Sequence, residues 1–192
     1  MKITTSQLKS LIKESIEEAM KEKKKGISIR GHKNLTIKSG HSFDELPDWF
    51  QEAQTKDAIV SMPAFDTFIQ WHNGTWINGT WEDGVWKNGT WKNGTWEDGT
   101  WEDGTWESGT REDGAWRNGI WLGGNWLTGL WNNGIWKNGT WEGGFWHNGT
   151  WEIGTWYNGV WEDGTWKNGK WKDGVWKQGK WLDKKNPHPK KR

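Results

Sequence analysis

The sequence contains no cysteine, which excludes disulfides and cysteine-ligated metal sites. No run approaches ~18 apolar residues, so we expect no helix that spans a membrane. The chain also lacks a large net charge of either sign: 26 basic and 25 acidic residues leave +1, so no overall field attracts nucleic acid or acidic membranes. The N-terminus, from Met1 to Thr5, has no apolar signal core. We therefore expect a cytoplasmic or virion-associated protein, with no signal peptide and no contact with membranes.

Ordinary aliphatic core residues are scarce as well, a composition that usually indicates disorder. Two other residue types compensate, because the chain has 23 Trp and 27 Gly among its 192 residues. The indole is the largest apolar side chain, so burial of most of these tryptophans would supply a core without aliphatics. The length fits one domain, or one domain with an appendage.

A five-residue repeat, W-x-x-G-x, occupies most of the chain. Trp recurs at every fifth position from Trp71 to Trp181, and Arg111 takes the one position where it is missing. Gly recurs in phase from Gly74 to Gly179 without exception. The residue before Gly is usually Asn or Asp, the residue after it is usually Thr, and the residue after Trp is usually charged. Asn-Gly and Asp-Gly tolerate positive φ and are typical of tight turns.

Two β architectures fit this unit: an antiparallel meander with a two-residue turn in every unit, and a β-solenoid with one unit per side of a coil. In an antiparallel ladder, successive residues direct their backbone groups to alternate neighbours. Two-residue hairpins therefore need an even number of residues between turns, but the repeat leaves three, as in Thr90 to Lys92. A meander would need a bulge in every unit. The fold class predicted is a mainly β solenoid, with a narrow antiparallel β-meander as the alternative.

The array over residues 71–182 resembles the pentapeptide-repeat family. Members of that family form a right-handed, four-sided β-helix, with a large apolar residue inward at the centre of each unit and a small one two positions earlier. Trp91 and Gly89 would take these positions here, in place of the usual Leu or Phe and the usual Ala, and the two changes offset in volume. The resemblance implies a four-sided solenoid of about five coils. Arg111 would then share a column with Trp91 and Trp131, either as a cation–π sandwich inside or turned outward.

The repeat tryptophans are expected to form a shared interior. This predicted core comprises Trp76, Trp81, Trp86, Trp91, Trp96, Trp101, Trp116, Trp121, Trp126 and Trp131. Similar W-x-x-G-x arrays occur in marine phage proteins, and the stretch from Met1 to Lys9 is similar to the openings of many such proteins. That resemblance favours a phage-encoded protein.

Residues 1–25 are predicted to form an amphipathic helix that docks or oligomerises, or that packs on its own protein. The predicted contact face of this helix includes Leu8, Leu11, Ile12 and Ile16. At the other end of the chain, residues 183–192 contain five basic side chains and two prolines, and they predict a basic disordered tail.

Residues 26–70 predict a small α+β segment that caps the solenoid. Alternating apolar residues indicate two short strands within 27–37, and a short helix is expected within 42–54. Further strands are expected at 58–62 and 65–69, leading into the first coil. A solenoid needs its open ends covered, because an exposed edge pairs with neighbouring molecules.

The sequence gives little support for catalysis or metal binding. His32, His41, Asp44 and Glu45 lie close together but match no recognised ligand spacing, so a solvated loop is favoured. No phosphate loop, nucleophile elbow or zinc signature is present. The acidic residues of the array stand where other units hold Lys or Asn, which marks them as surface residues. We therefore predict no enzyme activity, no catalytic, metal or cofactor-binding residues, and no cofactor.

One part of the array carries apolar side chains where other units hold charge or Thr. The residues concerned, predicted as a partner contact, are Ile120, Leu122, Leu127, Leu130 and Ile135. A contiguous apolar patch can mark a contact site, and the alternative is a set of surface residues packed among themselves.

These observations favour a structural or adaptor protein whose rigid Trp-cored array serves as a spacer or an interaction surface. We expect a protein partner, and oligomers could form through the N-terminal helix or the solenoid end. The first alternative is a module that binds carbohydrate or a host surface, which needs many exposed tryptophans. The second is a DNA-mimicking topoisomerase inhibitor, as some pentapeptide-repeat proteins are; the mixed surface charge disfavours it and makes a nucleic-acid partner unexpected.

Overall fold

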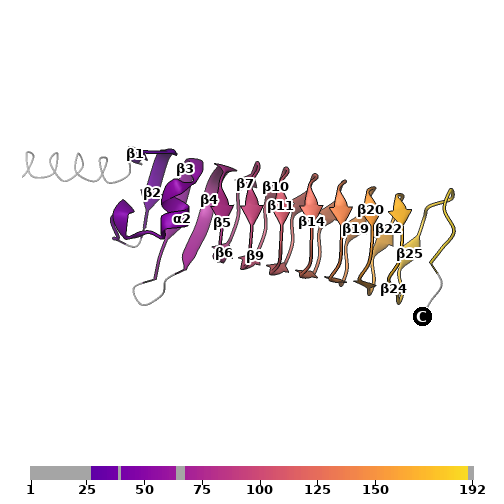
Figure 1. Cartoon of the computed structure of the whole chain (residues 1–192). Coiled ribbons are helices and arrows are strands. Elements are labelled where there is room, and N and C mark those ends of the chain that lie inside the picture. Colours follow the sequence, from indigo (N-terminus) through magenta and orange to yellow (C-terminus); the bar gives the residue numbers. More distant parts are fainter. Residues whose placement is uncertain (1–26, 39, 64–67, 190–192) are drawn as a thin grey trace, which may run out of the picture.

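The computed structural model describes residues 27–38, 40–63 and 68–189. Within them the chain is mainly β: a small capping segment leads into a parallel β-solenoid of about eight coils. The coils follow one another along a single axis, in the order of the sequence, and form an elongated rod (Figure 1). The helix predicted for residues 1–25, with Leu8, Leu11, Ile12 and Ile16, lies outside the described residues.

The solenoid has three sides, each a ladder of short parallel strands. The first side runs through β4 (Ile69–Asn78), β6 (Gly84–Trp86), β9 (Thr100–Trp101), β12 (Ala115–Trp116), β15 (Leu130–Trp131), β18 (Phe145–Trp146), β21 (Val160–Trp161) and β24 (Val175–Trp176). The second continues from β4 through β7 (Thr90–Trp91), β10 (Thr105–Trp106), β13 (Ile120–Trp121), β16 (Ile135–Trp136), β19 (Thr150–Trp151), β22 (Thr165–Trp166) and β25 (Lys180–Trp181). The third comprises β5 (Thr80–Trp81), β8 (Thr95–Trp96), β11 (Thr110–Arg111), β14 (Asn125–Trp126), β17 (Thr140–Trp141), β20 (Thr155–Trp156) and β23 (Lys170–Trp171).

The register shows that the predicted four-sided coil was wrong. Trp71 lies opposite Trp86, and Trp76 lies opposite Trp91, so one coil takes fifteen residues and not twenty. The solenoid accordingly has about eight coils instead of the five expected. The array strands pair in parallel throughout, so the antiparallel meander was wrong too.

The interior consists of three columns of indoles that run the length of the array. Along a column, successive rings stack in parallel, with centroids 4.6–5.1 Å apart and interplanar angles of 3–9°. Between columns, rings of successive units meet edge to face at 5.5–6.1 Å and 69–81°. These are the two favoured geometries of aromatic pairs. The predicted core tryptophans, from Trp76 to Trp131, are all fully buried.

Indole geometry explains why the coil closes with three sides. Three rings in mutual edge-to-face contact fill a triangle and leave no central void. Four rings at the same contact distances would surround an empty centre, and protein interiors are packed too densely to tolerate one. The expectation from the pentapeptide-repeat resemblance failed because smaller central residues leave room for a fourth side and Trp does not.

Backbone hydrogen bonds join each coil to the next. The N–H of the residue after Trp donates to the carbonyl of the Trp one coil earlier, as in Lys87 to Trp71 at 2.8 Å. The N–H of the residue after Gly donates to the carbonyl of the preceding coil's Gly, as in Thr95 to Gly79 at 3.0 Å. Each short strand therefore satisfies its polar groups through its neighbours, which is why strands of two residues suffice.

The repeat glycines are required by both backbone conformation and space. At Gly124, φ is +110°, a region that side-chain-bearing residues rarely adopt. A Cβ added there would lie 2.3 Å from the carbonyl oxygen of Gly109 in the preceding coil. The positive φ agrees with the turns expected from Asn-Gly and Asp-Gly, and the close approach of the preceding coil is a further reason for Gly that the sequence did not indicate.

Many of the Asn and Asp residues that precede a repeat Gly have a local role. Their side-chain oxygen accepts a hydrogen bond from the Gly N–H, as in Asn88 to Gly89 at 2.7 Å and Asp98 to Gly99 at 2.6 Å. Asn and Asp perform this role equally because both offer an Oδ1 acceptor. Either a neutral Asn or a charged Asp can therefore occupy this position at a given corner.

The capping segment covers the N-terminal end of the indole columns. β1 (Ile27–Ile29) and β2 (His32–Ile37) form the two predicted strands, and β2 pairs with β3 (Gln54–Ser61), which lies antiparallel beside β4. Instead of one helix within 42–54 there is a 3-10 turn, η1 (Phe43–Glu45), followed by α2 (Asp48–Glu52).

The short helix α2 supplies the aromatic part of the cap. Its Trp49 lies 5.1 Å from Trp81 and 6.4 Å from Trp76, measured between ring centroids, and Phe50 lies 6.2 Å from Trp76. Of the strands predicted at 58–62 and 65–69, the first lies largely within β3. Residues 64–67 are outside the described chain, and β4 begins at Ile69.

The C-terminal end is covered by residues of the segment that was expected to be disordered. Trp181 Nε1 donates to the carbonyl oxygens of Asp183 (3.0 Å) and Asn186 (3.2 Å). The ring of His188 packs edge-on against Trp176, with centroids 5.0 Å apart. Residues 183–189 thus fold over the last coil, and residues 190–192 lie outside the described part.

Two adjacent glycines provide a matched test of the coil contact. Gly124→Ala is expected to lower the free energy of unfolding by about 3 kcal/mol or more, because the new Cβ meets Gly109 and φ is strained. Gly123→Ala should change stability by less than about 1 kcal/mol, because φ there is not positive and the nearest atom, Glu107 O, is 3.7 Å away. Urea denaturation followed by fluorescence measures both; equal effects would contradict the contact.

Candidate interaction surface

Arg111 is the one residue of the array that breaks an indole column. It lies inside and is fully buried, between Trp96 and Trp126 on the third side, where the expected neighbours were Trp91 and Trp131. Its guanidinium carbon lies 4.2 Å from the centroid of Trp126 and 5.7 Å from that of Trp96. The inward, cation–π alternative is therefore the one observed, but with a fifteen-residue register.

The guanidinium has few polar partners. Nη1 donates a long hydrogen bond of 3.5 Å to the carbonyl of Gly114, whereas Nε and Nη2 are buried without a partner. Burial lowers the pKa of Arg111 to about 9, and the nearby carboxylates of Asp113 and Asp98 oppose that shift only in part. The carboxylates of Asp98 and Asp113 thus lie near the buried guanidinium of Arg111.

A shallow groove of about 660 Å³ runs along the corner beside this position. Asp83, Asp98 and Asp113 line it from equivalent places in three successive coils. Leu130 and Phe145, which are paired in β15 and β18, line it as well. The groove is completed by Gly99, Thr100, Gly114, Ala115, Thr128 and Gly129. It exists because Thr100 and Ala115 are small and Gly has no side chain, while Leu130 and Phe145 are large.

The structure distributes the predicted apolar contact residues over all three corners. Ile120 and Ile135 lie side by side in paired strands β13 and β16, between the first and second columns. Leu122 follows Trp121 of the second column and is exposed. Leu127 and Leu130 lie at the corner between the third and first sides, where Leu130 of β15 pairs with Phe145 of β18 and Leu127 is exposed. The five residues are close in sequence, but they lie on three different corners of the solenoid.

Phe145 and the wall aspartates were missed as a surface feature. Phe145 is 53% exposed, the most exposed apolar residue of the groove. The signal that could have found them is a period of fifteen: Glu82, Glu97 and Glu112 recur with it, as do the three aspartates. Neither the five-residue unit nor a twenty-residue coil places those residues in one line.

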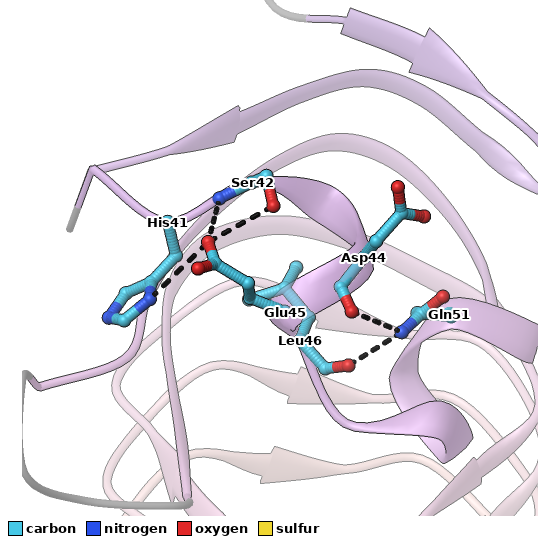
Figure 2. Close-up of polar contacts among 6 residues, drawn as sticks. All are labelled: His41, Ser42, Asp44, Glu45, Leu46 and Gln51. Atoms are coloured by element: carbon cyan, nitrogen blue, oxygen red, sulfur yellow. Dashed lines mark hydrogen bonds and ion pairs between the residues drawn. The ribbon is translucent and has the colours of Figure 1, made fainter.

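The His and acidic residues of the capping segment have structural roles (Figure 2). Glu45 Oε2 accepts from the backbone N–H (2.6 Å) and hydroxyl (3.0 Å) of Ser42, and the backbone hydrogen bond is the main reason that its pKa is lowered. His41 Nδ1 lies 3.7 Å from Glu45, and Gln51 Nε2 donates to the carbonyls of Leu46 (2.7 Å) and Asp44 (3.4 Å).

His32 is separate from that group. Its ring stacks on Phe50 and its Nδ1 lies 2.8 Å from the hydroxyl oxygen of Thr55, so it is a buried packing residue. Among the residues that the structure describes, no three His, Asp or Glu side chains are placed to hold a metal ion. Nor does the described chain contain a helix long and apolar enough to cross a membrane.

Comparison of the chain with known protein families, with curated protein sequences and with solved structures finds no match. The architecture itself, a parallel β-solenoid built from five-residue steps, agrees with a pentapeptide-like repeat fold. What the protein does must be argued from its own surface and core.

Replacing the buried cation with an indole should stabilise the protein. Arg111→Trp completes the third column and removes a charge that lacks compensating hydrogen bonds, so we expect a gain of about 2–4 kcal/mol at neutral pH. Arg117→Trp, at an exposed arginine, is the matched control and should change stability by less than about 0.5 kcal/mol. A loss of stability in Arg111→Trp would contradict the stacking geometry.

The stabilising effect of Arg111→Trp should depend on pH. In the unfolded chain Arg111 keeps its ordinary, higher pKa, whereas in the folded chain the pKa is lowered to about 9. The unfolded state therefore binds more protons between these values, and the stability of the parent rises with pH in that interval. The stability difference between Arg111→Trp and the parent should be largest below about pH 9 and smaller at about pH 10.5. Chemical denaturation at the two pH values measures it, and a constant difference would exclude the lowered pKa.

Proposed function

We propose that this protein is a non-catalytic structural element, a stiff rod that acts as a spacer or adaptor between other components. The observation that carries this proposal is the continuity of the interior. From Trp71 to Trp166 every tryptophan of the array is fully buried and stacked against the next coil, apart from the one position held by Arg111. Such a core leaves the array little freedom to bend, because every coil is held to its neighbours through ring and backbone contacts.

Surface ion pairs reinforce the connection between coils in the C-terminal half. Glu152 accepts from Lys137 (3.1 Å) and Lys167 (3.2 Å), and Glu162 accepts from Lys177 (2.9 Å) while contacting His147. The hydrogen bonds from lysine are the main reason that the pKa values of both glutamates are lowered. Exposed pairs contribute little individually, so stiffness depends on the indole columns and the backbone ladders.

Covered ends support a rod of defined length. Trp49 and Phe50 close the N-terminal end, and Asp183 to His188 close the C-terminal end. An uncovered solenoid end pairs with other chains and grows into filaments. The covered form suits a spacer that sets one distance.

The alternative functions receive less support. A carbohydrate-binding surface would need tryptophan rings accessible to sugars, and the array tryptophans are buried except Trp171 and Trp181, which are partly buried. A DNA-mimicking rod would need acidic charge on every side, whereas lysines alternate with glutamates on two corners. Association with a phage particle remains part of the proposal and depends only on the resemblance of the repeat and of residues 1–9 to marine phage proteins.

Intrinsic fluorescence distinguishes a structural core from a sugar-binding face. We expect blue-shifted tryptophan emission that acrylamide quenches weakly, because the rings are shielded from solvent. Titration with soluble oligosaccharides should leave the spectrum unchanged. Red-shifted, readily quenched emission would contradict the structural role, and a saturable change with a sugar would favour the carbohydrate alternative.

The spacer function predicts that length scales with the number of coils. Duplicating residues 132–161 inserts two coils in register and should lengthen the particle by about 10 Å, at ~4.8 Å per coil, without changing its cross-section. Small-angle X-ray scattering on the parent and the duplicated chain measures both quantities. If the particle thickens or becomes flexible instead, the array does not act as a rigid spacer.

A further inference from the structure

The tryptophan columns differ from an ordinary hydrophobic core in their continuity. Rings stack without a break from Trp71 to Trp176 on the first side and from Trp76 to Trp181 on the second, with no step longer than 5.1 Å between centroids. Edge-to-face contacts at 5.5–6.1 Å join neighbouring columns. Indole has the most electron-rich ring face among the side chains and is also one of the groups that lose an electron most easily. The core is therefore a continuous series of oxidisable groups in contact.

The interior of a column accommodates a positive charge. Arg111 is fully buried, with its guanidinium carbon 4.2 Å from the centroid of Trp126 and 5.7 Å from that of Trp96. It stays charged at neutral pH because its pKa, although lowered by burial, is still about 9. The negative faces of the indoles attract a cation in this position. An indole that has lost one electron is a cation between the same two kinds of face, so the stacking that holds Arg111 also stabilises a tryptophan radical cation.

A radical cation inside the columns has no base to which it can lose a proton. In the described part of the chain, the indole nitrogens of most fully buried array tryptophans, such as Trp91 and Trp121, have no hydrogen-bond partner. The remaining two, Trp131 and Trp141, donate only to backbone carbonyls at 3.1 Å. A neutral carbonyl is too weak a base to remove the indole proton. The charge therefore moves only when the next ring supplies an electron.

Both ends of the columns come near the surface. Trp181, which ends the second column, is only partly buried. At the other end Trp49 is also partly buried, and its ring centroid lies 5.1 Å from that of Trp81 and 6.4 Å from that of Trp76. Trp76 and Trp181 are 105 residues apart, which is seven coils of fifteen and about 34 Å along the axis at ~4.8 Å per coil. One electron-transfer step over that distance is slow, whereas successive steps between stacked rings are fast.

We propose that the indole columns carry oxidising equivalents between the two ends of the rod. A one-electron oxidant, such as a peroxide-derived radical, removes an electron from Trp181, and an electron from Trp166 fills the vacancy, which then passes from ring to ring. At Trp49 the indole N–H proton passes to water and leaves a neutral radical. A thiol or ascorbate supplies one electron and one proton and restores the ring.

The net change is the movement of one electron from the reductant at the cap to the oxidant at the C-terminal end, with release of one proton to water. No residue of the chain is consumed, because each ring regains the electron that it gives up. This activity goes beyond the spacer function and does not depend on it.

Arg111 creates one level at which the path is narrow. The third column stops there, because Trp96 and Trp126 are two coil steps, or roughly 10 Å, apart. Passage at this level depends on Trp106 in the second column and Trp116 in the first. Substitution of these two rings alone therefore interrupts all three columns, whereas the same substitution in another coil leaves the third column whole.

A tethered oxidant tests transfer along the full length of the chain. Leu182→Cys supplies an exposed thiol beside Trp181 for a ruthenium photo-oxidant, since the chain has no native cysteine. Trp49→Tyr reports arrival at the cap, with Tyr157→Phe to remove the one native tyrosine. After flash excitation and irreversible quenching of the ruthenium complex, transient absorption should show a tyrosyl radical, formed at a rate independent of protein concentration. Absence of this radical, or a rate that rises with protein concentration, would overturn the proposal.

A matched pair of double substitutions then tests the path. In the labelled chain, Trp106→Phe with Trp116→Phe should remove most of the tyrosyl signal, because phenylalanine keeps aromatic packing but is much harder to oxidise. Trp136→Phe with Trp146→Phe makes the same change in another coil, where Trp141 keeps the third column continuous, and should retain the signal. Urea denaturation verifies that both proteins are folded. Equal signals from the two would refute transfer through the columns.

Restoring a ring at the narrow level completes the test. Arg111→Trp, added to Trp106→Phe with Trp116→Phe, rebuilds the third column and should recover the signal, whereas the exposed substitution Arg117→Trp should not. If the double substitution at this level unfolds the chain, Arg111→Trp alone in the labelled parent decides the matter: it should speed the appearance of the tyrosyl radical, and Arg117→Trp should leave the rate unchanged. No recovery, or no increase in rate, would overturn the proposal.

Discussion

Direct contact between the glycines of successive coils is the constraint on which the rest of the structure depends. Because no Cβ intervenes, the backbone of one coil approaches the next closely enough for the ladder hydrogen bonds and for parallel stacking of the indoles at 4.6–5.1 Å. The positive φ at the same glycines turns the chain at each corner. One residue type thus sets both the spacing along the axis and the shape of the cross-section, and the indoles fill the triangle that results.

Much of this architecture could be predicted from the sequence, because the five-residue period is explicit. The inward tryptophans, the parallel solenoid and the strands near Ile29 and Leu35 follow from periodicity and from the parity of the hydrogen-bond ladder. The number of sides could not be predicted in the same way, since nearly identical units carry no strong signal of fifteen or twenty residues. It depends on how many indoles fill a cross-section, which is a packing property.

The groove could not be predicted from the sequence, for a related reason. Residues such as Asp83, Asp98 and Phe145 lie together only when the coil length is known. The apolar series from Ile120 to Ile135 appeared contiguous because it is continuous in sequence, but a three-sided coil directs consecutive units to different corners. Arg111 could be located inside or outside only after its neighbours, Trp96 and Trp126, were identified.

A unit of five residues within a coil of fifteen has one more consequence. Gain or loss of a single unit would leave the interior intact, because every column accepts the same Trp and every corner the same Gly. All later units would nevertheless rotate by a third of a turn about the axis, and side chains that shared a corner would be separated. Insertion or deletion of one repeat unit would therefore rearrange the surface of this protein without substituting any of the remaining residues, and the fold would stay the same.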